Sequence, residues 1–325
     1  MTDMETLPDG IWKKLFPRAL TLIDEIAKHG GISKPFFTFG GGTVLMLRYR
    51  HRYSKDIDIF VPDPQSLGYV NPRLSDVAAE ICNDQYTSGD SYVKLHLDEG
   101  EIDFVAAPNL LAMPHAFELW SLCGREVKVE TAGEIVAKKM YYRGGQATAR
   151  DLFDLAMILE VAPEHLLYAE PFIFRHLQNL RNQLSNPSKN FLHQFDAIET
   201  LDYRPGLEHA IEITGKYLHG LQQKSNQSLH AICAVIERAG HTHLLADVRR
   251  GEYTGRLFVT TSHHIAQLES TGTVVIHERH RIANGELPPE GSGSEIKIRY
   301  IRGMGDLRRL ANRRTPRSTR RKNKP

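Results

Sequence analysis

Two aspartates, Asp56 and Asp58, lie two residues apart in the run Asp56-Ile57-Asp58-Ile59-Phe60, which reads as a β-strand. Side chains of a strand alternate between its two faces, so both carboxylates point to the same side. Carboxylates held side by side repel each other and cost stability unless a cation lies between them. The pair therefore predicts a site for a divalent cation.

A glycine-rich turn precedes this pair in the run Phe39-Gly40-Gly41-Gly42-Thr43, and it opens a short helix that we predict from Thr43 to Arg50. Glycines leave backbone N–H groups free at a helix N-terminus, where a phosphate group can bind. A phosphate site beside a divalent-cation site is what transfer of a nucleotide from a triphosphate needs. Between the turn and the Asp pair, Arg52 adds positive charge, and the Ser54 hydroxyl could contact phosphate or cap the start of the strand.

The order of these residues resembles the signature of the nucleotidyltransferase superfamily, a Gly-Gly or Gly-Ser turn followed by an Asp-x-Asp strand. The longer pattern, Gly-Gly-Gly-Thr-x-Leu-x-Leu-Arg-x-x-His-Arg-x-Ser-x-Asp-Ile-Asp-Ile-Phe, resembles the AbiEii/AbiGii toxin family. Members of that family are the toxin halves of bacterial toxin–antitoxin and phage-defence pairs. The resemblance implies an enzyme that uses Mg²⁺, or Mn²⁺, and a nucleoside triphosphate, with a separate antitoxin protein as partner. It also implies a tRNA 3′ end as acceptor, with translation arrest as the consequence.

The superfamily resemblance further implies a third carboxylate on a strand next to the Asp pair. Residues 93–97 read as one strand, Asp98-Glu99-Gly100 as an acidic turn, and residues 101–105 as the return strand. Asp103 lies between two apolar residues of the return strand and is the expected third ligand, with Glu101 on the same face as the alternative. Without the resemblance, either residue would read as a polar side chain on the outer face of a half-buried strand.

A second segment fits the same family. Thr131 followed by Glu134 is a helix-cap pattern, and a second predicted helix, residues 149–159, follows the Gly144-Gly145 break. The family carries a lysine in the first of these helices and Arg-Asp-x-x-Asp in the second. These positions match Lys139 and the run Arg150-Asp151-Leu152-Phe153-Asp154.

The chemistry of this segment follows from its charges. Lys139 can neutralise triphosphate charge as a point cation. Asp151 and Asp154 are three residues apart and share a helix face, so one could orient Lys139 or help to activate the acceptor hydroxyl. Taken alone, the segment would read as two amphipathic helices with surface ion pairs.

These inferences give three sets of expected site residues. The metal ligands are Asp56, Asp58 and Asp103. The catalytic residues are these three together with Lys139, Asp151 and Asp154. The nucleotide-binding residues are Gly41, Gly42, Thr43, Arg52, Ser54, Lys139 and Arg150.

The composition is that of an ordinary globular protein, with 41% hydrophobic and 25% charged residues among 325. No apolar run approaches the roughly 20 residues that span a bilayer, and the first ten residues lack the features of a signal peptide. Cys82, Cys123 and Cys233 are too scattered for a zinc site or a disulfide framework. We therefore expect no membrane association and a reducing, cytoplasmic location.

The net charge of +2 hides a strong asymmetry. Residues 308–325 hold nine Lys or Arg and no acid, so the rest of the chain has 41 − 9 = 32 basic residues against 39 acidic ones, a net charge of −7. A segment this basic and this poor in apolar residues is predicted to be disordered. It either binds a nucleic-acid backbone without sequence preference or simply adds solubility.

We expect an α+β protein with a nucleotidyltransferase-like mixed sheet, flanking helices and a helical second half. The expected parts are a catalytic core (1–120), a helical domain that completes the active site (121–220), a linker or helical segment (221–250), a small β-rich domain (251–305) and a basic disordered tail (306–325). The polar run 222–228 reads as a break or linker. The region is predicted to be β-rich because glycines separate runs such as 257–261 and 273–277. Its segments Tyr253-Thr254-Gly255-Arg256, His263-His264-Ile265-Ala266-Gln267 and Val275-Ile276-His277-Glu278-Arg279 are similar to the KfrB domain of plasmid-borne proteins, which implies ligand or partner binding.

Two other functions stay open at this point. One is nucleotidylation of a protein hydroxyl, which uses the same residues on another acceptor. The other is a plasmid-encoded nucleic-acid-binding module that keeps the fold without catalysis. Salt-sensitive RNA binding favours the tRNA reading, whereas tight DNA binding that survives loss of the Asp pair favours the binding module.

Overall fold

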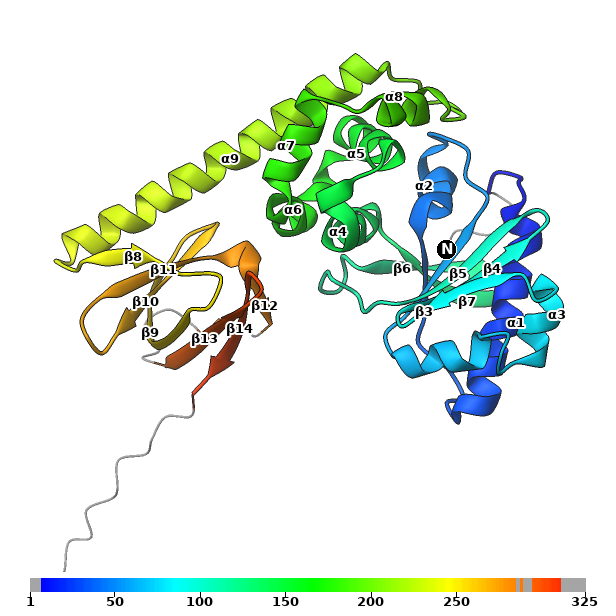
Figure 1. The fold of residues 1–325 in the computed structure, drawn as a ribbon, viewed down its shortest axis with the longest axis horizontal. Helices are drawn as coiled ribbons and strands as arrows, with labels where there is room; N and C mark the ends of the chain where they lie inside the picture. Colours follow the sequence, from blue (N-terminus) through cyan, green and yellow to red (C-terminus); the bar gives the residue numbers. More distant parts are fainter. Residues whose placement is uncertain (1–6, 285–286, 289–293, 311–325) are drawn as a thin grey trace, which may run out of the picture. The chain divides into compact units, whose positions relative to one another are not determined.

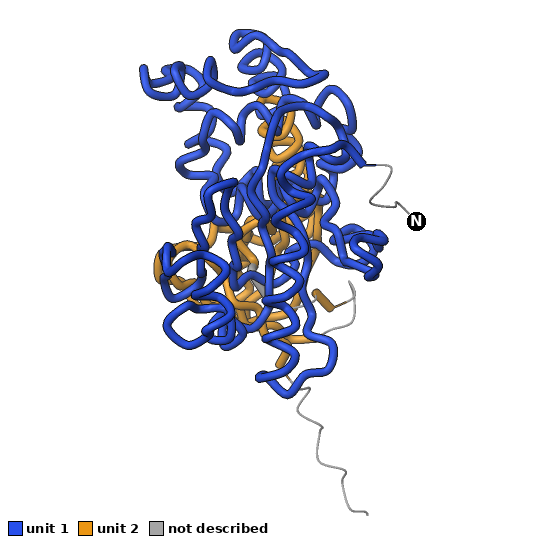
Figure 2. Tube along the Cα trace, turned by 90° about the vertical axis from the view of Figure 1, so that its right-hand side faces the viewer, with its two compact units in different colours: residues 1–218 blue, residues 219–325 orange. Residues whose placement is uncertain are grey.

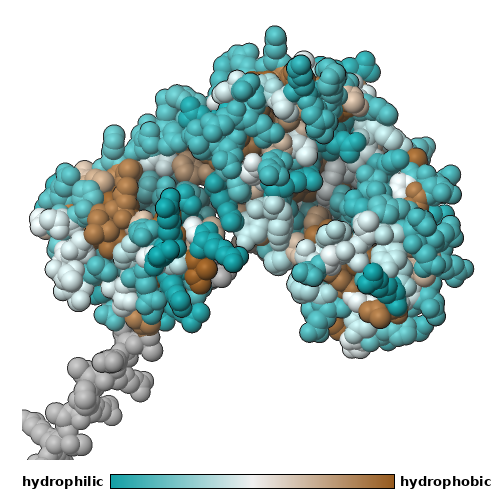
Figure 3. Space-filling view, in the orientation of Figure 1, coloured by the Kyte–Doolittle hydropathy of each residue, from teal (hydrophilic) through white to brown (hydrophobic). Residues whose placement is uncertain are grey.

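The computed structural model describes residues 7–284, 287–288 and 294–310. The chain divides into two compact units, residues 1–218 and 219–325, which Figure 2 shows in different colours. Hydrophilic side chains predominate on the face drawn in Figure 3. Within the described ranges, no helix has an apolar stretch long enough to cross a membrane.

The first unit is built on a seven-stranded mixed sheet with the strand order β3-β4-β5-β2-β1-β7-β6 (Figure 1). The pairs β2–β5 and β1–β7 are parallel, and the other neighbours are antiparallel. The strands are β1 (Thr38–Gly40), β2 (Ile57–Val61), β3 (Tyr86–Gly89), β4 (Tyr92–Leu97), β5 (Gly100–Ala106), β6 (Phe117–Leu122) and β7 (Arg125–Glu130).

Helix α1 (Trp12–Gly30) covers the apolar face of the sheet, where it packs against β2 and β5. The inward residues of β2 on this face are Ile57, Ile59 and Val61, all of them buried. Aromatic rings extend the same core, since the centroids of Phe16 in α1 and Phe39 in β1 are 4.7 Å apart. Because strand side chains alternate, Asp58 lies on the opposite face of β2.

The remaining helices of this unit fall into two groups, one before and one after the last strands of the sheet. After α2 (Gly41–Tyr49), a 3₁₀ helix (Pro64–Val70) and α3 (Asp76–Cys82), the chain completes the sheet and then becomes helical. The later helices are α4 (Ala132–Arg143), α5 (Ala149–Val161), α6 (Leu166–Arg175), α7 (Leu177–Ser185) and α8 (Lys189–Asp196). The expected helical second half is therefore present.

Helix α9 (Leu207–Arg238) crosses the boundary between the units. The break expected at residues 222–228 is absent, because this polar run continues α9. Its periodicity explains the continuity. Leu218, Leu221, Ser225, Ser228 and Ile232 are all buried and recur every three or four residues, so two serines keep the inner stripe of the helix intact.

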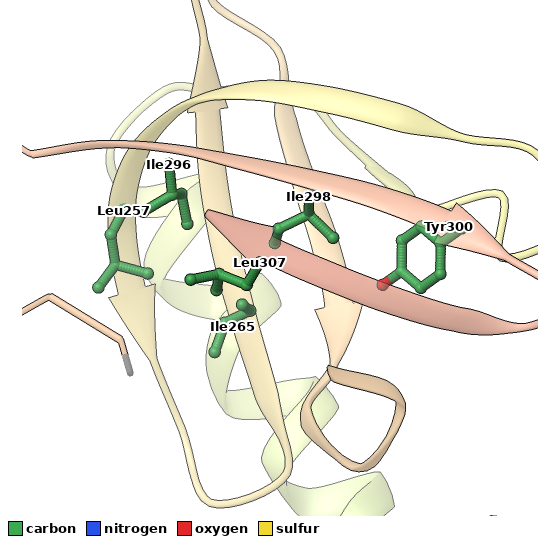
Figure 4. Close-up of a cluster of buried hydrophobic side chains, with 6 residues drawn as sticks. All are labelled: Leu257, Ile265, Ile296, Ile298, Tyr300 and Leu307. Atoms are coloured by element: carbon green, nitrogen blue, oxygen red, sulfur yellow. The ribbon is translucent and has the colours of Figure 1, made fainter. Parts of the chain in front are cut away.

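The second unit contains another seven-stranded sheet, with the order β12-β14-β13-β9-β10-β11-β8. Its strands are β8 (His243–Leu245), β9 (Glu252–Thr260), β10 (His264–Glu269), β11 (Val274–Glu278), β12 (Ile282–Asn284), β13 (Glu295–Ile301) and β14 (Met304–Arg309). Figure 4 shows one of its cores, formed by Leu257, Ile265, Ile296, Ile298, Tyr300 and Leu307. Ile232 and Ile236 of α9 pack in a second core with Ala266, Val274 and Ile276.

The expected β-rich region is present, but it begins and ends outside the expected bounds. Residues 306–309, expected in the tail, pair with β13 as part of β14. Residues 311–325, which hold most of the predicted tail, lie outside the described residues.

Candidate active site

The glycine turn between β1 and α2 is shaped around Asp58. Helix α2 begins at Gly41, two residues earlier than expected, and Gly41 has a φ of +73°. A Cβ atom on Gly41 would lie 1.8 Å from Asp58 Oδ2, so any side chain there would displace the carboxylate. Only glycine meets both conditions. The turn therefore places the first backbone atoms of α2 directly against the Asp pair.

The three expected metal ligands come from β2, β5 and the loop before β2. Asp58 on β2 lies directly opposite Asp103 on the parallel strand β5. Asp56 precedes the strand, which begins at Ile57, and its Oδ1 accepts a hydrogen bond of 3.2 Å from the Glu101 N–H. This hydrogen bond ties the loop to β5, so the three carboxylates line one cavity.

Both opposed carboxylates are reluctant to ionise. Burial and, to a smaller extent, the neighbouring Asp56 carboxylate raise the pKa of Asp58 to about 6, against the effect of Lys139. Burial and then the Asp58 carboxylate raise the pKa of Asp103 to about 7. Such values arise where negative charges share a site with too few cations. The pair would therefore gain from an added cation.

Lys94 supplies part of that positive charge. Its Nζ lies 3.0 Å from Asp103 Oδ2 and 2.6 Å from Glu101 Oε2. Burial alone would lower the pKa of Lys94, but its hydrogen bonds with Glu101 and Asp103 raise it. Sequence reasoning missed this lysine, which the register of β4 against β5 places directly opposite Asp103.

The carboxylates fit a hard divalent cation by their chemistry but do not form a closed set of ligands. Asp103 Oδ1 is buried and has no hydrogen-bond partner among the described residues. Carboxylate oxygens are the donors that Mg²⁺ prefers. Within the described part of the chain, however, no group of three or more His, Cys, Asp or Glu side chains is arranged to hold a metal ion. The expected trio is thus brought to one cavity, with the Asp103 carboxylate bound to Lys94.

Lys139 on α4 enters the same cavity between two buried aspartates of α5. Its Nζ lies 2.8 Å from Asp151 Oδ1 and 2.7 Å from Asp154 Oδ2. Asp151 also closes a capping box with Thr148, which fixes the start of α5. Burial opposes its ionisation, but Lys139 and Arg143 outweigh burial and lower the pKa of Asp151 to about 2. The two carboxylates therefore hold the ammonium group in one place.

Asp154 is the centre of a second, fully buried cluster. Its carboxylate accepts two hydrogen bonds from Arg52, of 2.6 Å to Nε and 2.9 Å to Nη2, and lies 2.8 Å from His51 Nε2. Burial opposes ionisation, but Arg52 and Lys139 hold the pKa of Asp154 well below its usual range. A buried carboxylate that stays ionised is a poor proton acceptor. Of the two expected roles, the geometry favours orienting Lys139 over activating an acceptor.

Three of the expected nucleotide-binding side chains have other partners. The Arg52 guanidinium is 3% exposed and is bound to Asp154. The Thr43 hydroxyl is fully buried and donates to the backbone carbonyl of Asp56 at 2.5 Å and lies 3.1 Å from Ser54 Oγ. Thr43 and Arg52 therefore position the loop around the Asp pair. Thr43 could therefore contact a phosphate only through its backbone, because its hydroxyl is buried and hydrogen-bonded.

A distant segment, residues 197–203, holds the loop that carries the Asp pair. The Tyr53 N–H donates to the Glu199 carbonyl at 2.7 Å, and the Leu201 N–H donates to the His51 carbonyl at 3.0 Å. Arg52 and Thr200 also form an antiparallel β-bridge. Sequence reasoning did not find this segment, since no motif marks it.

The cavity over the site has a volume of about 480 Å³. It brings together expected residues from four parts of the chain with residues that were not expected. The expected lining residues are Gly42, Arg52, Ser54, Asp56, Asp58, Asp103, Lys139 and Arg150, together with Glu101, the alternative third carboxylate, and the other lining residues are Lys94, Arg143, Thr148, Gln194 and Ala197. Asp151 and Asp154 lie behind Lys139, and Gly41 lines an adjoining cavity.

Comparisons with known proteins identify the family of the chain. No curated protein sequence matches the chain. Among solved structures, MenT4, a nucleotidyltransferase toxin from Mycobacterium tuberculosis H37Rv, matches with a TM-score of 0.39 and 16% identity, over 66% of this chain and 86% of that chain. The profile of a family described as "Nucleotidyl transferase AbiEii toxin, Type IV TA system" matches residues 31–214, more than half of the chain. The chain therefore belongs to the AbiEii family of nucleotidyltransferase toxins from type IV toxin–antitoxin systems.

Proposed function

We propose that this nucleotidyltransferase toxin transfers a nucleotide from a nucleoside triphosphate to the 3′ end of tRNA, in a reaction that depends on Mg²⁺. The observation that supports it most is that Asp56, Asp58 and Asp103 share one cavity with Lys139 and the glycine turn. Acidic metal ligands, a fixed cation and free backbone N–H groups are the parts that phosphoryl-type transfer requires. The family supplies the reaction class, whereas metal and acceptor are our proposal.

In this proposal the residues of the chain divide the work. Asp56 and Asp58, with Asp103, would hold Mg²⁺ or Mn²⁺. When bound, such an ion neutralises charge on the phosphate oxygens and lowers the pKa of the acceptor hydroxyl. Lys139, fixed by Asp151 and Asp154, binds the phosphates as a point cation.

The bond changes follow from this placement. The backbone N–H groups at Gly41 and Gly42 bind phosphate at the start of α2. The acceptor hydroxyl gives its proton to solvent water, and its oxygen forms a bond to the α-phosphorus in line with the leaving group. Pyrophosphate then leaves with the electron pair of the broken P–O bond.

A nucleic-acid acceptor fits the charges at the mouth of the site. Arg150 and Lys55 are exposed, and both line a second cavity of about 180 Å³ on the Asp56 side of the catalytic cavity. Lysines and arginines at a mouth concentrate a polyanion close to the reacting atoms. The basic residues 311–325 would strengthen the attraction of the whole protein for a nucleic acid, without sequence preference, and we propose that the reaction takes place in the cytoplasm. As in other toxin–antitoxin pairs, we propose a separate antitoxin protein as partner.

The test is incubation of the protein with each α-labelled nucleoside triphosphate, Mg²⁺ and total bacterial tRNA. Asp58→Asn removes one charge from the site without changing shape, and Asp90→Asn makes the same change at an exposed turn as the matched control. We expect label on tRNA with wild type and Asp90→Asn, and none with Asp58→Asn or after removal of divalent ions by a chelator.

The same assay separates the other functions. Label on a protein that depends on Asp58 would replace the tRNA acceptor with a protein hydroxyl. No label on any acceptor, together with DNA binding that is the same in wild type and Asp58→Asn, would contradict the catalytic proposal and favour a binding module.

A further inference from the structure

The sheet face that carries the carboxylates changes character two residues further along each strand. On β2, Phe60 follows Asp58, and on β5, Val105 follows Asp103, with both pairs on the same face. The register places Asp58 opposite Asp103 and Phe60 opposite Val105. A row of two carboxylates is thus followed, about 6.5 Å away, by a row of two apolar side chains.

A separate cavity of about 240 Å³ lies over this apolar row. Ile135 and Tyr142 of α4 line it from the other side. Five further lining residues also belong to the candidate active site, namely Gly41, Gly42, Asp58, Asp103 and Lys139. Tyr142 is 52% exposed, so its ring is available to a ligand. The cavity therefore joins the reacting centre to an apolar surface with an accessible aromatic ring.

Charged groups at the inner side of this cavity are already paired. Lys138 is buried, with its Nζ 2.5 Å from Glu130 Oε1 and 3.9 Å from the centre of the Phe60 ring. This contact fixes the Phe60 ring in place. The cation of Lys138 is thus bound to Glu130 instead of being free for a phosphate.

We propose that this apolar cavity binds the nucleobase of the nucleoside triphosphate, an inference that rests on the proposed transferase function. The order of groups along β2 matches the order of groups in the substrate. Asp58 marks the reacting α-phosphate, and Phe60 begins the apolar row on the side of the ribose and the base. The spacing of about 6.5 Å between the rows is on the order of one ribose.

The flat faces of a nucleobase suit the lining of this cavity. Bases stack on aromatic side chains whatever their hydrogen-bonding edges, and Tyr142 offers such a ring opposite Val105 and Phe60. This side of the site thus binds a base through its faces and leaves the choice among bases to contacts at the edges.

The acceptor, which also carries bases, belongs on the other side. Its polyanionic backbone needs exposed cations, and Lys55 and Arg150 lie together on the Asp56 side. Arg143 borders the apolar cavity and the catalytic cavity of about 480 Å³, but its Nη2 is 2.7 Å from Asp151 Oδ1. The two cavities thus separate a nucleobase subsite from an acceptor subsite, with the carboxylates between them.

Binding measurements without any acceptor test this assignment. The dissociation constants of all four nucleoside triphosphates and of inorganic tripolyphosphate are measured by calorimetry in the presence of Mg²⁺. Tripolyphosphate occupies the phosphate subsite and has no base. We expect at least one triphosphate to bind about tenfold more tightly than tripolyphosphate.

Two variants change the apolar cavity in different ways. Val105→Trp fills it, and Tyr142→Ala removes its exposed ring. Both should weaken the preferred triphosphate about tenfold while leaving tripolyphosphate within about twofold of wild type. Tyr168→Ala is the matched control, because Tyr168 is a helical tyrosine of similar exposure (46%) that does not line the cavity.

The outcomes separate the two proposals. If both variants bind triphosphates as wild type does, or if the triphosphates bind no better than tripolyphosphate, the nucleobase subsite is wrong while the transferase function stands. If neither triphosphates nor tripolyphosphate bind to wild type, the proposed function fails and this inference fails with it. Should Val105→Trp not fold, Tyr142→Ala alone decides, since its side chain is half exposed.

Discussion

The Lys94 ammonium lies 3.0 Å from Asp103 Oδ2, and the two residues are direct partners across the antiparallel strands β4 and β5. A protein cation thus occupies one oxygen of the carboxylate that the superfamily resemblance assigns to a metal. Its other oxygen has no partner among the described residues. Lys94 and a divalent ion therefore compete for the same negative charge.

Replacement of Lys94 should strengthen binding of divalent ions. Lys94→Met removes the competing charge, so we expect the Mn²⁺ dissociation constant, measured by electron paramagnetic resonance without nucleotide, to fall about tenfold. Lys28→Met is the control, because Lys28 is 68% exposed and lines neither the catalytic cavity nor the apolar cavity. Weaker Mn²⁺ binding by Lys94→Met would show that the lysine supports the metal site instead of competing with it.

The stability of the metal-free protein should fall as pH rises. The pKa values of Asp58 and Asp103 are raised to about 6 and about 7, so the folded state holds more protons than the unfolded state between about pH 4 and 7. The free energy of unfolding then decreases across this window. At pH 8, Asp58→Asn should be more stable than wild type by on the order of 1–3 kcal/mol.

Urea unfolding at pH 5 and pH 8 with a chelator present measures this effect. The difference between Asp58→Asn and wild type should be small at pH 5 and large at pH 8. An equal difference in the free energy of unfolding at pH 5 and pH 8 would mean that ionisation of Asp58 and Asp103 does not destabilise the folded protein. Added Mg²⁺ should raise the free energy of unfolding of the wild-type protein at pH 8, back toward its value at pH 5.

Loss of the Asp154 carboxylate should be costly for both fold and activity. Asp154→Asn leaves Arg52 and Lys139 buried against a neutral partner, which should destabilise the protein by about 3–5 kcal/mol. Asp202→Asn, at an exposed pair with Arg50, should cost about 0–1 kcal/mol. Thermal unfolding compares the two variants, and a similar cost for both would contradict a central role for Asp154.

Gly41→Ala should abolish nucleotide transfer, because the added methyl group displaces the Asp58 carboxylate. Its Cβ would lie 1.8 Å from Asp58 Oδ2, and the φ of +73° adds backbone strain. Gly31→Ala is the control, because Gly31 has a similar φ of +68° with open space around it. Both variants should lose about 1 kcal/mol of stability from backbone strain, but only Gly41→Ala should lose activity in the labelling assay. Equal activity in the two would remove the close contact as an explanation.

Arg150→Ala should weaken the acceptor and spare the nucleotide. Arg150 is exposed at the mouth on the Asp56 side, so we expect a higher KM for tRNA, a weaker dependence of that KM on salt and an unchanged dissociation constant for the triphosphate. Arg73→Ala, at another exposed arginine, controls for the loss of one charge. A changed triphosphate affinity in Arg150→Ala would move this residue to the nucleotide.

The sequence predicted those parts of the site whose residues are close together along the chain. Strand alternation predicts that Asp56 and Asp58 point to one side, and helix spacing predicts that Asp151 and Asp154 share one face of α5. The pairing of Lys94 with Asp103 depends on the register between two strands, which alternation alone leaves open. Segment 197–203 is out of reach for a different reason, since its contacts with the catalytic loop are backbone hydrogen bonds that place no demand on side-chain type.

The continuity of α9 shows a second limit. Residues 222–228 consist of Gln, Lys, Ser and Asn, a polar composition that is typical of a linker. This composition hides the spacing of three or four residues between the inward positions of a helix. Ser225 and Ser228 are small enough to pack at inner positions, so the run keeps its stripe with few apolar residues. Composition thus misled where periodicity was informative.

The hydrogen bonds between the catalytic loop and residues 197–203 also set an order of events during synthesis. The chain is made from its N-terminus, so Arg50 and Tyr53 form hydrogen bonds with their backbone partners, Asp202 and Glu199, only after about 150 further residues have been added. At ribosomal speeds this delay is on the order of 10 s. Lys139 and Asp154 also follow the Asp pair, so a nascent toxin carries its acidic residues well before it carries the contacts that hold them in place.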